Sequence, residues 1–72
     1  MTTIEFLQAK LKNNEDGLRK IAVNFNGIVK EVVANSGADE HEVTLNVEAI
    51  KRALKTRCDV LKELIKKAEQ IA

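Results

Sequence analysis

The sequence predicts an all-α protein whose 72 residues form one domain, a long antiparallel helical hairpin. One heptad pattern of apolar residues runs through both halves of the chain, which is typical of two long amphipathic helices that face each other. A polar stretch that contains a glycine, residues 35–42, separates the halves and supplies the turn. A chain this short supports only one hydrophobic core.

The heptad frame is defined by its a and d positions. In the first half these are Ile4, Leu7, Leu11, Asn14, Leu18, Ile21, Phe25, Ile28 and Val32. In the second half they are Val47, Ile50, Leu54, Arg57, Leu61, Leu64, Ala68 and Ile71. Fifteen of these seventeen positions are apolar, although only 44% of the chain is hydrophobic. That excess predicts a seam between two helices.

The first helix is expected to span about residues 3–34. Thr2 and Glu5 have capping-box spacing, in which the hydroxyl accepts a hydrogen bond from a free backbone amide and the carboxylate reaches back to the cap. The helix ends before Gly37, because glycine readily adopts the left-handed conformation that closes a helix. Both signals lie at the ends of the heptad pattern.

Residues 13–17 resemble a turn, because Asn, Asp and Gly are weak helix formers. The heptad frame nevertheless passes through them in phase, since Leu11 and Leu18 are seven residues apart. A loop has no reason to preserve that phase, so we expect one continuous helix. The alternative is a three-helix domain broken near Asn14.

The second helix is expected to span about residues 46–71. Asn46 is a favourable N-cap residue. We expect Val43, Thr44 and Leu45 before it to form a connector that covers the end of the core. Asp39 and Glu42 have the spacing to cap an earlier start.

The two helices are expected to pair in a register in which opposed residue numbers sum to about 79, which places Phe25 opposite Leu54. Asn14 and Arg57 are the polar residues in this seam and are candidates for setting register or oligomeric state. The alternative for Arg57 is that its alkyl stem packs on Ile21 while the guanidinium extends to solvent.

A hairpin this small needs further support, because two helices alone leave much of their apolar surface exposed. The single cysteine excludes an intrachain disulfide, and no Cys and His pair has zinc-finger spacing. The second helix carries apolar residues on both sides of the seam: Ala53 and Val60 on one flank, Cys58 and Ile65 on the other. These four residues are the candidate dimer interface of a homodimeric four-helix bundle. The alternative is a hairpin completed by another protein.

Phe6, Val23 and Val33 lie off the predicted seam and are candidate partner-binding residues. Single exposed apolar residues are common on proteins, so the alternative is that these three are incidental. If they have a role, they mark where another protein docks.

Lys51, Lys55, Lys62 and Lys66 share one outward arc of the second helix. The alternative function that they suggest is nucleic-acid binding, with the lysines on phosphates. Glu48 and Glu63 lie four residues before Arg52 and Lys67, which is the spacing of ordinary surface ion pairs. The net charge is only +1 and there is no Tyr or Trp for base stacking, so we expect a solvated face.

The sequence predicts no enzyme, metal site or cofactor. His41 stands among carboxylates, but neighbouring loop residues seldom converge on a metal. Cys58 has no histidine base placed to activate it and is expected to fill the core. The chain has neither a secretory n- and h-region nor an apolar stretch of about 20 residues, so we expect a cytoplasmic protein.

We therefore expect a small, non-enzymatic protein–protein interaction module that acts through a helical surface. Adaptors, co-chaperones and regulators or inhibitors, including those of phage and mobile elements, have this size and architecture. Its expected partners are a second copy of itself, another protein, or both, without a membrane. A nucleic-acid-binding bundle and a structural subunit of a larger assembly are the alternatives.

Overall fold

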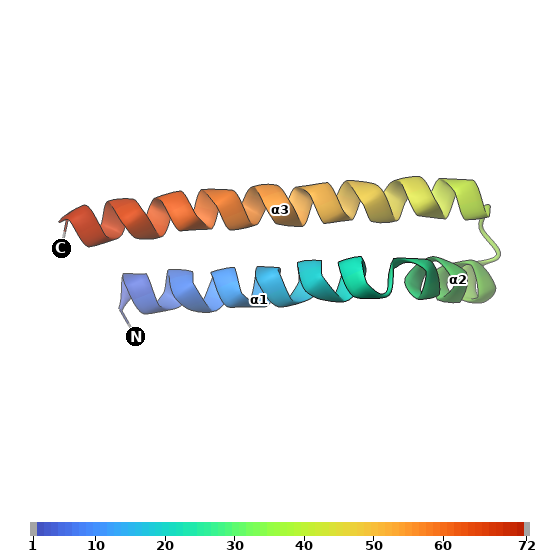
Figure 1. Cartoon of the computed structure of the whole chain (residues 1–72), viewed down its shortest axis with the longest axis horizontal. Helices are drawn as coiled ribbons and strands as arrows, with labels where there is room; N and C mark the ends of the chain where they lie inside the picture. Colours follow the sequence, from blue (N-terminus) through green and yellow to red (C-terminus); the bar gives the residue numbers. More distant parts are fainter. Residues whose placement is uncertain (1, 72) are drawn as a thin grey trace.

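The computed structural model describes residues 2–71, which form three helices joined by short connections. These are α1 (Thr3–Val23), α2 (Phe25–Ser36) and α3 (Glu40–Ile71). The predicted all-α class is confirmed. α1 and α3 lie side by side and run in opposite directions, so the start of α1 lies near the end of α3 (Figure 1). The molecule is elongated, measuring 50 × 18 × 18 Å.

The start of α1 follows the predicted cap. The Oγ1 atom of Thr2 accepts a hydrogen bond from the backbone amide of Glu5 at 3.1 Å. Residues 13–17 lie inside α1, so the predicted continuity of the helix there is confirmed and a break near Asn14 is excluded. The Nδ2 atom of Asn14 donates to the Lys10 carbonyl at 2.7 Å, which satisfies this weak helix former within the helix.

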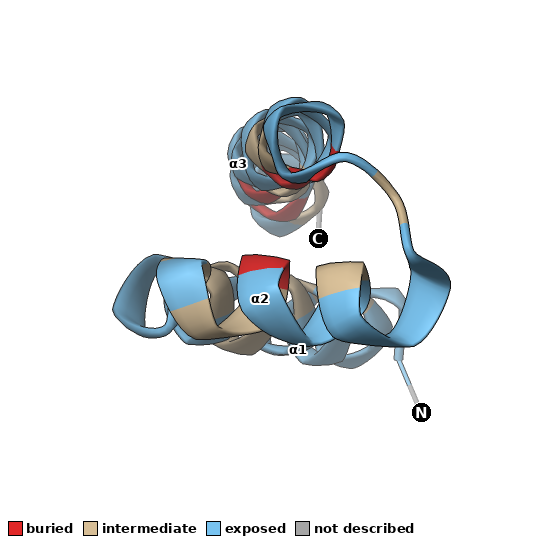
Figure 2. Cartoon of the chain, turned by 90° about the vertical axis from the view of Figure 1, so that its right-hand side faces the viewer, coloured by how far each residue is buried: buried red, intermediate tan, exposed pale blue. Residues whose placement is uncertain are grey.

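The expected helix over residues 3–34 is nevertheless wrong, because the chain leaves helical geometry at Asn24, with φ −127° and ψ 39°. Asn24, Asn26 and Gly27 have low helix propensity and gather within four residues. A Cβ atom on Gly27 would lie 2.8 Å from the Cγ atom of Asn24, so glycine leaves the space that this side chain occupies. As a result α2 swings away from the axis of α1 and lies across the end of α3 (Figure 2).

The connection between α2 and α3 is shorter than expected. Gly37 adopts the left-handed conformation, with φ 71°, and its amide donates to the Val33 carbonyl at 2.9 Å, as predicted for a glycine cap. α3 then begins at Glu40 rather than near residue 46, because the Oδ2 atom of Asp39 accepts from the Glu42 amide at 3.2 Å. The predicted connector at residues 43–45 is therefore wrong, since these residues are helical.

The best-buried part of the core lies where α2 crosses α3. Val29 from α2 packs there with Val43 and Val47 from α3. Figure 2 shows buried positions on α2 and on the side of α3 that faces it. The other buried side chains, Cys58 and Ile65, lie further along α3. No residue of α1 is buried, although its seam residues are partly covered. The molecule thus has one small core cluster and a long, thinly covered seam.

The register of α1 and α3 differs from the predicted one. Leu54 lies against Gly17, and Leu18 shares a groove with Lys55, so the numbers of opposed residues sum to about 72 instead of 79. The physical reason is the early start of α3, which shortens the turn and shifts α3 by about one heptad.

The new register also changes which side of α3 faces α1. The seam residues of α1 are spaced alternately three and four residues apart. On an antiparallel helix, the residues opposite them must decrease in number by the same alternating steps of three and four. The residues that do so are Leu54, Cys58, Leu61, Ile65 and Ala68, and all five are buried or partly buried. The expected seam residues Ile50, Arg57, Leu64 and Ile71 are instead exposed. This side of α3 places Cys58 rather than Arg57 in the seam, which avoids burying a guanidinium group.

Candidate interaction surfaces

One side of α3 carries exposed apolar residues at regular spacing. We call this surface the apolar flank and define it as Ile50, Ala53, Val60 and Leu64, with Arg57 among them. The side chains of Ile50, Val60 and Leu64 are 53%, 52% and 47% exposed. Large apolar residues half open to water on one side of a helix mark a surface with room for a partner.

A groove between α1 and α3 borders the apolar flank. It is lined by Lys10, Asn14, Thr56, Arg57, Val60 and Leu61. Phe6 is half-exposed one turn before Lys10, whose Nζ atom lies 5.7 Å from the centroid of the Phe6 ring. Leu64 lies one turn beyond Val60 on the antiparallel helix, so Phe6 and Leu64 flank the same end of the groove. The apolar surface therefore continues from α3 onto α1.

The four residues of the predicted dimer interface lie in two different environments, and the dimer itself stays a prediction. Ala53 and Val60 are exposed, as an interface in the monomer requires. Cys58 and Ile65 are buried inside the hairpin, where Cys58 is only 4% exposed, so placing them on a second interface was wrong. Ile50 and Leu64 were predicted to lie in the inner seam and are exposed beside Ala53 and Val60 instead. The signal that identifies them is the equal-step rule for antiparallel helices.

Of the three predicted partner-binding residues, two are accessible and one packs against the core. Phe6 is half-exposed and Val23 is 80% exposed, so both are accessible. Val33 packs against the buried cluster of Val29 and its neighbours, which excludes it from a docking surface. Its orientation follows from the break at Asn24, which turns α2 and exposes Val32 instead.

The two polar residues predicted for the seam have different positions. Asn14 is partly buried beside the groove and bonded to its own helix. Arg57 is exposed on the apolar flank, so its placement in the seam was wrong. Across residues 2–71 the ion pair that forms joins Arg19 and Asp16, and Arg57 is not part of it. Arg57 is thus a free cation in the middle of an apolar surface.

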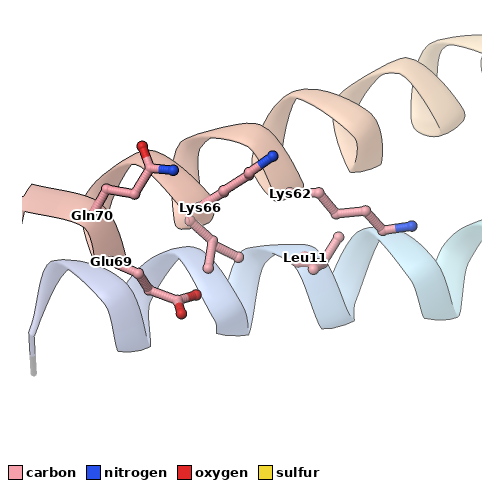
Figure 3. Close-up of a pocket in the computed structure, with 6 residues that line it drawn as sticks. Leu11, Lys62, Lys66, Glu69 and Gln70 are labelled. Carbon is pink, nitrogen blue, oxygen red and sulfur yellow. The ribbon is translucent and has the colours of Figure 1, made fainter.

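The opposite side of α3 forms a basic flank, which we define as Lys51, Lys55, Lys62 and Lys66, all exposed. One groove along it contains Lys51 and Lys55 together with Glu48, against Leu18 and Ala22 of α1. A second groove contains Lys62, Lys66 and Glu69 against Leu11 (Figure 3). Leu11 points from α1 towards α3, while Lys62 and Glu69 extend over the groove. Carboxylates therefore interrupt the positive charge in both grooves.

The acidic segment before α3 acts as a helix cap. Asp39 bonds to the first turn of α3, and His41 is exposed within that turn. In the part of the chain that the structure describes, no three His, Cys, Asp or Glu side chains gather as metal ligands would. Asp39 thus caps α3 through its side chain.

Searches of protein-family models, curated proteins and solved structures gave no significant match to this chain. Within residues 2–71 none of the three helices is long and apolar enough to cross a bilayer.

Proposed function

We propose that the protein is a non-enzymatic protein–protein interaction module that acts through its helical surface, and that two copies associate as a homodimeric four-helix bundle. The observation that carries this proposal is the amount of surface that the single chain leaves exposed. A small adaptor or regulator with this architecture needs no reactive group, because its activity is binding itself.

The accessible surface of the chain is 5489 Å² for a mass of 8.0 kDa. A compact monomer of that mass exposes about 4,450 Å² by the usual scaling of surface with mass. The excess of about 1,000 Å² is comparable to the roughly 800 Å² that each partner buries in a standard protein–protein interface. Association with one partner of similar size would therefore bring the chain to an ordinary level of exposure.

The weak core supports the same proposal. Among the described residues only five are buried, and none has less than 2% of its surface exposed. Complete burial of a Leu, Ile or Val side chain contributes about 1.5–3 kcal/mol, of which half-exposed residues such as Ile50 and Leu64 realise only a part. A partner on the apolar flank supplies the remainder, so binding and folding stability are coupled.

The test combines light scattering with circular dichroism over protein concentrations from about 1 to 200 μM. We expect a helical dimer whose thermal midpoint rises with concentration. A chain that is poorly folded alone but becomes helical with another protein would replace self-association by heteromeric binding, and the interaction function would stand. A fully helical, stable monomer that binds no protein of its native host, even after crosslinking, would refute the proposal.

Nucleic-acid binding through the basic flank is the second candidate. The observation that favours it is that the four lysines lie on one flank and are not engaged in ion pairs across residues 2–71. Glu48 and Glu69, which line the same grooves, weaken it. Phosphate contacts make binding fall steeply with salt, so retention on RNA or DNA at low salt that is lost at moderate salt would support this function. Absence of retention at low salt would exclude it.

A further inference from the structure

We propose that a second copy of the chain covers the apolar flank, with α3 packed antiparallel on α3 of the partner subunit and the two-fold axis between Arg57 and Val60. This inference rests on the proposed dimeric function and specifies which surface forms the interface. Three properties favour the apolar flank over the other exposed surfaces as the dimer interface.

The first property is spacing. The positions 50, 53, 57, 60 and 64 advance by three, four, three and four residues, which is the pattern of a coiled-coil seam. This pattern lies on a side of α3 different from the inner seam that contains Cys58 and Ile65. One long helix therefore carries two seams, and only the inner one is covered within the chain.

The second property is self-complementarity. In two antiparallel copies of α3, seam residues stay opposite each other when the spacing between them is the same on both helices. This condition places Ala53 opposite Leu64 of the partner subunit. The same register places Arg57 level with Val60 of the partner subunit. Ala53, the one small residue of the flank, then faces a large one, so the helices can approach closely there. The same register places Ile50 level with Lys67 of the partner subunit, whose alkyl stem can cover it. Phe6 adds apolar surface beside Leu64 at both ends of the interface.

The third property is area. The flank on α3, the groove beside it and Phe6 on α1 form one continuous surface that extends over both helices. The whole chain exposes about 1,000 Å² more than a compact monomer of its mass, which leaves room for the roughly 800 Å² per subunit that a stable dimer buries. The basic flank does not meet this need, because four lysines from each copy would be brought together there.

The flank is positively charged, so a second copy of the chain and an acidic partner should bind to it with opposite dependence on salt concentration. Lys10 and Arg57 line the groove, and no carboxylate is among its lining residues. In the dimer the Arg57 side chains of both copies lie close to the two-fold axis and repel each other, and salt screens this repulsion. Self-association should therefore tighten as salt is raised. An acidic helix of another protein on the same flank would bind more weakly at high salt.

The test is sedimentation equilibrium of the full chain at about 0.05 and 0.5 M NaCl, with three variants. Leu64→Lys should raise the dimer dissociation constant about a hundredfold, because two ammonium groups enter the apolar contact near Arg57. Leu45→Lys is the matched control, since Leu45 is also a leucine of α3, is 51% exposed and lies outside the flank, and it should leave the constant unchanged. Arg57→Leu should lower the constant about tenfold and remove its salt dependence.

A dimer that weakens with salt, or that Leu64→Lys leaves intact, would overturn the assignment of this face while the dimeric function stands. A monomer at all concentrations would overturn the second copy as occupant and leave only heteromeric interaction. If circular dichroism shows that Leu64→Lys has lost helicity, its dissociation constant no longer reports on the interface, and the Arg57→Leu variant tests the inference instead. An unchanged dissociation constant and salt dependence in that variant would overturn the inference.

Discussion

Gly17→Ala should stabilise the protein by about 1 kcal/mol, because glycine is that much less favourable than alanine inside a helix. Gly17 lies in the middle of α1, with helical backbone geometry that alanine adopts without strain. A Cβ atom at this position would lie 3.7 Å from the Cδ1 atom of Leu54, which is an ordinary van der Waals contact. The whole gain in helix propensity should therefore appear as stability.

The other two glycines are matched controls with different expected signs. Gly37→Ala should cost about 1 kcal/mol, because its positive φ is strained for alanine even though no atom lies within 4 Å of the added Cβ. Gly27→Ala should gain less than half of the Gly17 effect. The added Cβ would lie 2.8 Å from the Cγ atom of Asn24 and would displace that side chain.

The assay is thermal unfolding followed by circular dichroism at one fixed protein concentration, because association also shifts the midpoint. For a domain of this size 1 kcal/mol corresponds to roughly 4–8 °C. We expect the midpoint of Gly17→Ala to rise, that of Gly27→Ala to change little and that of Gly37→Ala to fall. A lower midpoint for Gly17→Ala would refute the continuous helix through residues 13–17 or the contact with Leu54.

Three further predictions test other parts of the structure. Val29→Ala should cost about 2 kcal/mol in urea unfolding, whereas Val32→Ala should cost less than about 0.5 kcal/mol, because only Val29 is buried; equal costs would contradict the orientation of α2. Asp39→Ala should cost about 1 kcal/mol through loss of the α3 cap, and an unchanged urea midpoint would indicate that α3 begins later. Cys58 in the native protein should react with a thiol reagent at least about tenfold more slowly than in urea, and equally rapid reaction would show that the inner seam is open.

The helix boundaries that depend on local chemistry were accessible from the sequence. Gly37 has the one positive φ among the described residues and ends α2 as a glycine cap does. The phase of Leu11 and Leu18 correctly predicted a continuous helix between them. Phase did not reveal the break at Asn24, because Ile21 and Phe25 keep the same spacing on either side of a one-residue interruption. Heptad phase reports inserted loops but not a bend within the pattern.

The start of α3 and its inner face were harder to predict because they depend on each other. Val43 and Val47 are four residues apart and both are buried, so they continue the helical pattern towards Asp39. The expected start near residue 46 lengthened the turn and displaced the register by about one heptad. With that register, Cys58 and Ile65 appeared to lie outside the seam.

The residue spacing in the sequence is enough to decide which face of α3 packs against α1. The expected pairing set Leu18 against Leu61 and Asn14 against Leu64. Asn14 and Leu18 are four residues apart on the first helix, whereas Leu61 and Leu64 are only three apart on the second. When the spacing between seam residues differs on the two antiparallel helices, successive residues no longer lie opposite each other. The expected pairing therefore could not continue along the hairpin. With equal steps the inner face takes Cys58, and Arg57 moves outward with Leu64. The apolar residues left on that side keep the spacing of three and four residues that is typical of a helix seam, and this spacing is the reason for the proposed contact with a second copy of α3.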